Sequence, residues 1–194
     1  MNLLVLGPQG SGKGTQAQRL SADHGIPHVS TGDMFRAAIA AGTDLGRRVE
    51  PILAAGELVP DELTVALIRE RLSQPDAARG FVLDGFPRNT AQAEELDAML
   101  AEIGRRLDAV LFFDIPDEVA LERLLGRASE EARHDDRPDA IERRLEIYHE
   151  HTEPVVERYR ATGTLVPLHA SGTVGEVAAE IAGALELLGE GAAA

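Results

Sequence analysis

A glycine-rich loop near the N-terminus constrains the fold of this chain more than any other feature. Residues 7–13 read Gly-Pro-Gln-Gly-Ser-Gly-Lys, with the spacing G-x-x-x-x-G-K, and lie between the apolar run 3–6 and an amphipathic stretch from about Thr15 to His24. Glycines let backbone N–H groups approach phosphate oxygens closely, and a helix N-terminus adds unpaired N–H groups and a positive dipole end. The pattern predicts a strand, a phosphate-binding loop and a helix. The alternative is a glycine-rich turn without a ligand, and the combination of strand, lysine and helix argues against it.

The loop contains the one lysine of the chain. Lys13 is accompanied by 18 arginines, and 33 acidic residues bring the formal net charge to −14. A field of this sign repels nucleic acid and anionic membranes, so we expect neither as a partner, and a phosphate ligand must be held by a local cluster of cations. There is no cysteine and no apolar run of the roughly 20 residues that a membrane-spanning helix needs. We therefore expect a cytoplasmic protein without disulfides and without a structural zinc site.

Short apolar runs alternate with amphipathic stretches along the chain. Five of these runs are rich in Val, Leu and Phe and too short for helices, so we expect buried strands at residues 3–6, 28–30, 81–84, 109–114 and 164–168. Alternating strands and helices with short connections predict a parallel sheet with helices on both faces. The expected fold is a single α/β domain over residues 1–194, with a three-layer, doubly wound, five-stranded parallel sheet.

Two helices near the C-terminus have clear signals. A helical apolar face runs from Ile141 to Tyr159, with a kink expected at Pro154. The last helix opens with Thr173-x-x-Glu176, the pattern of a capping box.

Two other stretches fit the alternation poorly. From residue 31 to 72, helical segments follow one another without a strand, punctuated by Gly42, Gly56 and Pro60. We expect a small helical insertion that moves against the sheet. Residues 127–138 are charged and nearly free of apolar side chains, and we expect a solvated loop between two helices.

Three segments carry a resemblance to a known family. The loop continues as Gly14-Thr15-Gln16, residues 30–33 read Ser-Thr-Gly-Asp, and residues 81–88 read Phe-Val-Leu-Asp-Gly-Phe-Pro-Arg, with Gln92 after them. In this order and at this spacing they resemble the adenylate kinase family over nearly the whole chain. The resemblance implies reversible phosphoryl transfer from Mg·ATP to AMP, giving two ADP, in a monomer that serves adenine nucleotide homeostasis.

The same resemblance implies two mobile parts around the site. Residues 30–59 would form the insertion that binds the nucleoside monophosphate (NMP), and residues 127–137 would form a lid. Only residues 128–132 separate Arg127 from Arg133. This is similar to the short-lid form of the family, which has no zinc-binding cysteines.

Site residues follow from the resemblance position by position. The implied catalytic cations are Lys13, Arg88, Arg127, Arg133 and Arg144. The residues implied to bind ATP are Gly10, Ser11, Gly12, Lys13, Gly14, Thr15, Arg123, Arg127 and Gly172. Those implied to bind AMP are Thr31, Arg36, Glu57, Leu58, Val59, Gly85, Phe86, Pro87, Arg88, Gln92, Arg133 and Arg144.

Elementary chemistry supports the use of arginine here. Phosphoryl transfer brings two polyanions together, and a guanidinium grips two phosphate oxygens at once and stays charged. Arg88 follows the third strand, at the edge where open α/β sheets bind ligands. Arg144 lies at the border of an apolar helix face from which Arg143 points away. The alternatives are a surface ion pair for Arg88 and solvated charges for the lid arginines.

The expected Mg²⁺ site departs from the general loop pattern. Gly14 follows Lys13 directly, and the first hydroxyl comes one residue later at Thr15. We therefore expect Mg²⁺ to be held by phosphates, by water and by the carboxylates of Asp84 and Asp33, the latter by resemblance. Asp33 has an alternative role as a helix cap, and the two roles are compatible.

Thr31 and Gln92 bear on the choice of acceptor. Both side chains can hydrogen-bond a base edge, and in the family they mark adenine, whereas kinases of uridylate and cytidylate usually carry Ala and Asn at these places. The donor base, gripped by Arg123 and the backbone near Gly172, stays open between ATP and GTP. A kinase for another monophosphate, and a nucleotide-binding sensor or assembly module without chemistry, remain as alternatives.

Overall fold

The computed structural model describes residues 1–131 and 138–191 of the chain. It contains a five-stranded sheet with the strand order β2-β3-β1-β4-β5, in which every neighbouring pair is parallel. The strands are β1 (Asn2–Leu6), β2 (His28–Ser30), β3 (Phe81–Asp84), β4 (Ala109–Asp114) and β5 (Leu165–His169). The predicted fold class is confirmed, and the strand limits agree with the expected ones to within one residue.

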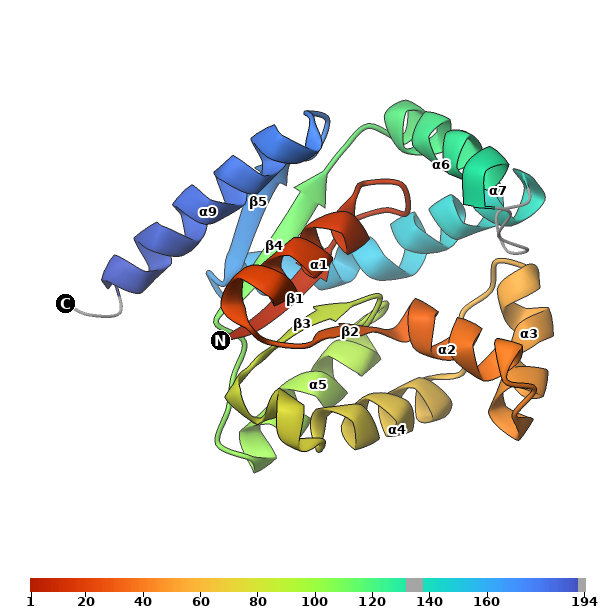
Figure 1. The fold of residues 1–194 in the computed structure, drawn as a ribbon, viewed down its shortest axis with the longest axis horizontal. Coiled ribbons are helices and arrows are strands. Elements are labelled where there is room, and N and C mark those ends of the chain that lie inside the picture. Colours follow the sequence, from red (N-terminus) through yellow and green to blue (C-terminus); the bar gives the residue numbers. More distant parts are fainter. Residues whose placement is uncertain (132–137, 192–194) are drawn as a thin grey trace.

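Helices cover both faces of this sheet (Figure 1). The α-helices are α1 (Lys13–His24), α2 (Thr31–Ala40), α3 (Asp44–Ala54), α4 (Asp61–Leu72), α5 (Thr90–Glu102), α6 (Asp117–Glu131), α7 (Pro138–Ile147), α8 (Glu153–Ala161) and α9 (Val174–Gly191). A 3₁₀ turn, η1 (Pro75–Arg79), precedes β3, and a π-helical turn, η2 (Tyr148–Thr152), joins α7 to α8. None of the helices in the described ranges is both long and apolar enough to cross a membrane.

Two apolar clusters hold the three layers together. Alternate residues of β1 point to opposite faces, because side chains alternate along a strand. Leu4 and Leu6 pack with residues of α4, α5 and α8, whereas Leu3 and Val5 pack with residues of α1, α6 and α9. The sheet is therefore buried on both sides, as its nearly continuous apolar runs require.

The strand register brings the ends of three strands to one edge. Val5 in β1 pairs with Asp84 in β3, and Asp84 pairs in turn with Ser30 in β2. The loop after β1, the turn after β3 and the start of α2 after β2 consequently meet at the carboxyl edge, where parallel sheets bind ligands.

The expected insertion, residues 30–59, contains α2 and α3, which pack against each other. A small apolar cluster built around Phe35, Val49 and Val59 joins these two helices and also packs against Leu63 and Leu67 of the following α4. Ile68 of α4 is in addition buried in the core of the sheet. Of the helices between residues 31 and 72, α4 thus packs on both the insertion and the sheet.

Two helical details differ from or refine the expectations. α6 continues to Glu131 rather than giving way to a loop at Arg127. The physical reason is that the residues after Arg127 include alanine and glutamate, good helix formers, and no proline or glycine. The break expected at Pro154 is present as η2, with the proline in the first turn of α8, because proline cannot donate the helical N–H bond.

The predicted capping box at the start of α9 is confirmed. The Thr173 N–H donates to Glu176 Oε2 at 2.8 Å, and the Glu176 N–H donates to the Thr173 hydroxyl at 3.3 Å. The hydrogen bonds from the Thr173 backbone and hydroxyl hold the pKa of the Glu176 carboxyl below its ordinary value.

Replacing Thr173 with alanine should destabilise the protein, because the Glu176 N–H loses its acceptor. We expect a loss of about 1 kcal/mol, seen as a fall of roughly 2–4 °C in the melting temperature. Ser171→Ala in the same loop removes a hydroxyl that caps no helix and serves as the control. Equal melting temperatures for Thr173→Ala and the wild type would contradict the prediction.

Candidate active site

The loop between β1 and α1 adopts a backbone shape that its glycines permit. Gly10 has a φ of +83°, in the left-handed region, and a Cβ there would lie 2.4 Å from the carbonyl oxygen of Ala120 in α6. Only glycine fits such a position. Lys13 begins α1, and its Nζ donates hydrogen bonds to the Pro8 carbonyl oxygen at 2.7 Å and the Ser11 hydroxyl at 3.4 Å. The ammonium group is thereby held over the loop.

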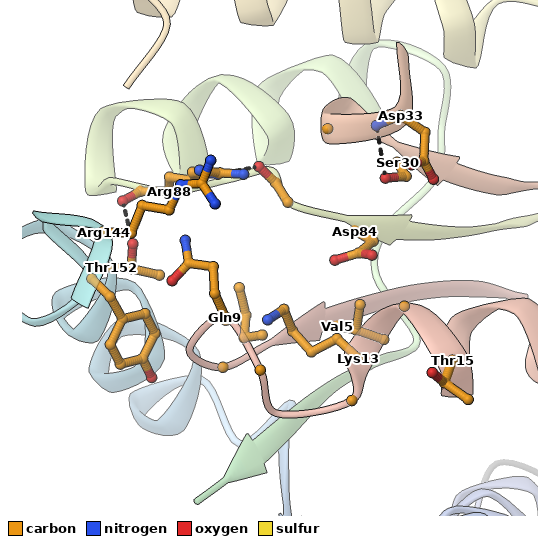
Figure 2. A pocket seen from close by; sticks show the side chains of 18 of the residues that line it. Val5, Gln9, Lys13, Thr15, Ser30, Asp33, Asp84, Arg88, Arg144 and Thr152 are labelled. Carbon is orange, nitrogen blue, oxygen red and sulfur yellow. Dashed lines mark hydrogen bonds between the residues drawn. The ribbon is translucent and has the colours of Figure 1, made fainter. Parts of the chain in front are cut away.

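A cleft at the carboxyl edge of the sheet gathers cations from distant parts of the chain (Figure 2). Those of the described residues that line it are Lys13, Arg36, Arg88, Arg123 and Arg144. The loop glycines and the carboxylates of Asp33, Glu57 and Asp84 complete much of the lining. This concentration of positive charge in a chain of net charge −14 suits a strongly anionic ligand.

Hydrogen bonds to its own turn, to α5 and to η2 hold Arg88 in place. Its Nε donates to the Gly85 carbonyl oxygen at 2.8 Å, and its backbone N–H donates to Gln92 Oε1 at 2.8 Å. Its own carbonyl oxygen accepts a hydrogen bond from the Thr152 hydroxyl at 2.9 Å. The turn after β3 is therefore tied to α5 and η2, which fixes the base of the Arg88 side chain at the cleft (Figure 2).

A second, smaller cleft adjoins Arg88. It is lined in part by Thr31, Leu58, Val59, Gly85 and Gln92. The Thr31 hydroxyl donates to the Gly85 carbonyl oxygen at 2.9 Å. Gly85 has a φ of +78°, and a Cβ on it would lie 2.6 Å from the Thr31 hydroxyl oxygen, so a side chain here would displace Thr31. Apolar walls with a few polar groups are typical of a site for a small organic ligand.

Two carboxylates line the larger cleft near the loop. Asp84 lies beside the loop, since a Cβ on Gly14 would be 3.6 Å from Asp84 Oδ2, and the same oxygen is 3.4 Å from His28 Nε2. Asp33 accepts a hydrogen bond from Arg36 Nη2 at 2.6 Å. Burial alone would raise the pKa of Asp33, but the hydrogen bond from Arg36 and its charge outweigh this effect and lower it.

These carboxylates fit a partial role in holding Mg²⁺. Oxygen ligands and water are what this ion prefers, and it is usually bound through one or two carboxylates together with substrate phosphates. Within the described ranges, no three His, Asp or Glu side chains cluster as a ligand set for a metal. The helix cap of α2 is the Ser30 hydroxyl, which accepts from the Asp33 N–H at 3.3 Å. The capping role considered for Asp33 thus belongs to Ser30.

One arginine of α6 and one of α7 also line the larger cleft. Arg123 donates to the carbonyl oxygens of Ala170, Ser171 and Gly172, at 2.9, 3.1 and 3.4 Å. Arg144 lines the cleft with only 8% of its surface exposed. Its neighbour Arg143 is not a lining residue but pairs with Glu57, which lines both clefts, with 2.7 Å between Nε and Oε1.

With this geometry in place, the relatives of the chain are informative. The family model described as Adenylate kinase matches residues 5–164. Curated proteins named adenylate kinase are 49% identical to this chain in Stenotrophomonas maltophilia (strain K279a), over 96% of this chain and all of the relative, and 49% identical in Parvibaculum lavamentivorans, over 93% of this chain and 90% of the relative. A third, from Xanthomonas campestris pv. campestris (strain 8004), is 47% identical over 95% of this chain and 99% of the relative. The chain belongs to the adenylate kinase family.

Most residues predicted from the adenylate kinase resemblance line one of the two clefts. A few do not. The side chains of Ser11 and Phe86 are buried, and Phe86 is part of the core of the sheet. The Gly172 carbonyl oxygen accepts a hydrogen bond from Arg123, which lines the larger cleft. Arg127 belongs to α6, but its side chain and the whole of Arg133 lie outside the described residues, as does most of the predicted lid.

Several residues at the adenylate kinase clefts were not found by sequence reasoning. His28 lines the larger cleft, and nothing in its local sequence marks it. Gln9 lines it too; it lies within the predicted phosphate-binding loop but was not among the residues predicted to bind a ligand. Tyr148 and Thr152 line it too, and the recurrence four residues after Arg144 was a usable signal. Burial raises the pKa of the Tyr148 hydroxyl, so this group stays neutral in the cleft. Asp61 contacts Gln92 of the smaller cleft, and its sequence context is that of an ordinary acidic residue in a first helical turn.

The Glu57–Arg143 pair leads to a prediction about protonation. The hydrogen bond from Arg143 and its charge hold the pKa of the Glu57 carboxyl below its ordinary value of 4.5. Arg143→Gln should therefore raise this pKa toward 4.5, as read by carboxyl ¹³C NMR titration, whereas Arg143→Lys keeps a cation and should retain part of the lowering.

The sign of the pH dependence follows. A carboxyl whose pKa is lowered on folding adds stability above its unfolded pKa and loses it as the pH falls through the folded value. The stability difference between wild type and Arg143→Gln should therefore shrink below about pH 4.5. An unchanged Glu57 pKa in Arg143→Gln would show that the pair is not formed in solution.

Proposed function

We propose that the protein is a nucleoside monophosphate kinase that catalyses Mg·ATP + AMP ⇌ 2 ADP. The observation that carries the proposal is the meeting of Lys13, Arg88 and Arg144 in one cleft beside a smaller cleft that contains Thr31 and Gln92. The first set suits transferring phosphates and the second suits the base of an acceptor. The names of the relatives support the same reaction.

Catalysis in this proposal consists of positioning and charge stabilisation. The attacking oxygen belongs to a phosphate that is already ionised, so no general base is needed. Lys13 follows the transferring group from the loop side, while Arg88 and Arg144, together with Arg127 and Arg133 from the lid, neutralise the charge on its oxygens. The donors are in place before the reaction, since Arg88 is anchored at both its backbone and its side chain.

The donor nucleotide lies on the loop side. Backbone N–H groups of residues 10–15 bind its phosphates, and Arg123 flanks its base next to Gly172. Asp84 and Asp33 would hold Mg²⁺, through water, and the ion would supply charge that offsets the phosphates.

The acceptor lies on the insertion side. Arg36 and Arg88 bind the phosphate of AMP, and Glu57, Leu58, Val59 and the turn 85–88 surround the nucleoside. Thr31 and Gln92 read the adenine edge. Closure of residues 30–59 and of the lid 127–137 over both nucleotides expels water and prevents hydrolysis of ATP. In this proposal the enzyme acts as a cytoplasmic monomer and maintains adenine nucleotide homeostasis.

The proposal is tested by measuring ADP formation from Mg·ATP with AMP, CMP, UMP or GMP, beside a water-only control. We expect fast turnover with AMP and little with the other acceptors or with water. Fast turnover with a pyrimidine monophosphate would move the protein to another acceptor class. Nucleotide binding without any transfer would favour a sensor.

Lys13 offers a second test because it is the one lysine of the chain. Amine-selective acylation can reach only Lys13 and the N-terminal amine. It should abolish activity, and Mg·ATP should protect, because the phosphates cover Nζ. Removing one such electrostatic contact commonly costs about 10²–10³ in kcat, so Lys13→Met should fall in this range.

The Lys13→Arg variant is the control, because its N-terminal amine is the one amine left to acylate. Acylation should change the remaining activity of this variant little. Full acylation of Lys13 in the wild type with activity retained would contradict its assigned role.

A further inference from the structure

The Gln92 side-chain amide is held at both ends by the protein. Its Oε1 accepts the hydrogen bond from the Arg88 backbone N–H at 2.8 Å. Its Nε2 donates to Asp61 Oδ1 at 2.6 Å. Gln92 is only 2% exposed, so these partners rather than bulk water decide how the amide is oriented.

This arrangement allows one orientation of the amide. Turning the amide by 180° would place Nε2 against the Arg88 N–H, donor against donor, and Oε1 against the Asp61 carboxylate, acceptor against acceptor. Hydrogen bonds to a charged group are stronger than neutral ones, so Asp61 supplies the larger share of the preference. The amide then has one lone pair of Oε1 and one hydrogen of Nε2 left for a ligand.

Asp61 is itself well fixed for this role. It is in the first turn of α4, and both of its carboxylate oxygens also accept from Asn89 Nδ2, at 3.0 and 3.1 Å. Asn89 caps α5 by accepting the Gln92 N–H at 2.8 Å. The carboxylate thus joins the start of α4 to the start of α5, where it contacts both Asn89 and, one turn of helix later, the Gln92 amide that it orients.

The orientation of this amide matters because purines differ in the order of their polar groups. Adenine presents an amino donor at C6 next to a ring-nitrogen acceptor, whereas hypoxanthine and guanine present an oxygen acceptor at C6 next to an N–H donor at N1. An amide in one orientation matches the first order, and the same amide turned by 180° matches the second. An amide held in one orientation therefore selects one class of purine base.

We propose that Asp61 is a specificity-determining positioning residue, which selects 6-aminopurine over 6-oxopurine monophosphates by locking the Gln92 amide. The proposal rests on the proposed function, in which Gln92 reads the acceptor base. Asp61 acts through Gln92 and does not touch the base.

Thr31 supports the same selection from the other side of the cleft. Its hydroxyl lies 2.9 Å from the Gly85 carbonyl oxygen, which has no hydrogen, so the Thr31 hydrogen occupies this contact. Toward a ligand the hydroxyl offers lone pairs only. It can accept from an amino group at C6 but cannot donate to an oxygen there.

The test compares Asp61→Asn with Glu62→Gln, which removes the same charge from the next residue in the first turn of α4, where the side chain is exposed. kcat/KM is measured for AMP and for IMP and GMP, with binding of AMP and IMP also measured without ATP. In Asp61→Asn the amide loses the charged acceptor that supplies most of its orientational preference, and the AMP-over-IMP ratio should fall by about tenfold or more through KM and binding. Glu62→Gln should keep the wild-type ratio.

Two further variants separate orientation from general damage. Asp61→Ser also suits a first turn and should lower the ratio like Asp61→Asn, which keeps the test decisive if one variant folds poorly. Asn89→Ser retains a capping hydroxyl and the Asp61–Gln92 contact, and should keep the ratio. An equal loss of selectivity in Asn89→Ser would assign the effect to the helix start rather than to the amide.

The outcomes distinguish the two levels of the argument. If the wild type prefers AMP and both Asp61 variants keep the wild-type AMP-over-IMP ratio, the role of Asp61 is overturned but the proposed function stands. A wild type without preference for AMP over IMP overturns the proposed reading of adenine, and with it this inference.

Discussion

The arrangement of this site answers one electrostatic constraint: a chain of net charge −14 has to hold two phosphate-bearing ligands against their mutual repulsion. Three of its cations are steered by neutral backbone oxygens. Lys13 is bonded to Pro8, Arg88 to Gly85 and Arg123 to Ala170. Each of these hydrogen bonds fixes the direction in which the cation points. The parallel sheet makes this possible, because it brings the loop, the turn after β3 and the start of α2 to one edge.

The strands and the loop could be predicted because their signals are local. A buried strand of a parallel sheet is a short apolar run, and the loop, the capping box and the break before Pro154 are each written in a few consecutive residues. The end of α6 was predicted wrongly because charge was taken as the sign of a loop, although alanine and glutamate favour a helix whatever their polarity.

Contacts between elements distant in the sequence could not be predicted in the same way. Arg143 was expected to point away from the helix core, and it does, but its partner Glu57 lies 86 positions earlier. Asp61 has the sequence signal of an ordinary acidic first-turn residue, and only the packing of α4 on α5 brings it to Gln92. Gln92 itself was predicted as a base reader, and its restraint by protein on both sides became visible only with the fold. Positions that follow from a pattern are thus predictable, and orientations that depend on a second element are not.

The two clefts share the start of α2, the segment after α3 and the turn 85–88, but among the described residues the loop and α1 line the larger cleft alone and α5 lines the smaller one alone. Lys13 and Arg144 line the larger cleft alone, whereas Thr31, Leu58, Val59 and Gln92 line the smaller one alone. Substitutions at Leu58 and Val59 can therefore alter the smaller cleft without touching Lys13 or Arg144, whereas a change at Gln92 also removes a partner of Arg88. This division lets the fold evolve in parts. A few substitutions in the smaller cleft can change which acceptor binds, while the residues of the larger cleft that serve the chemistry stay the same.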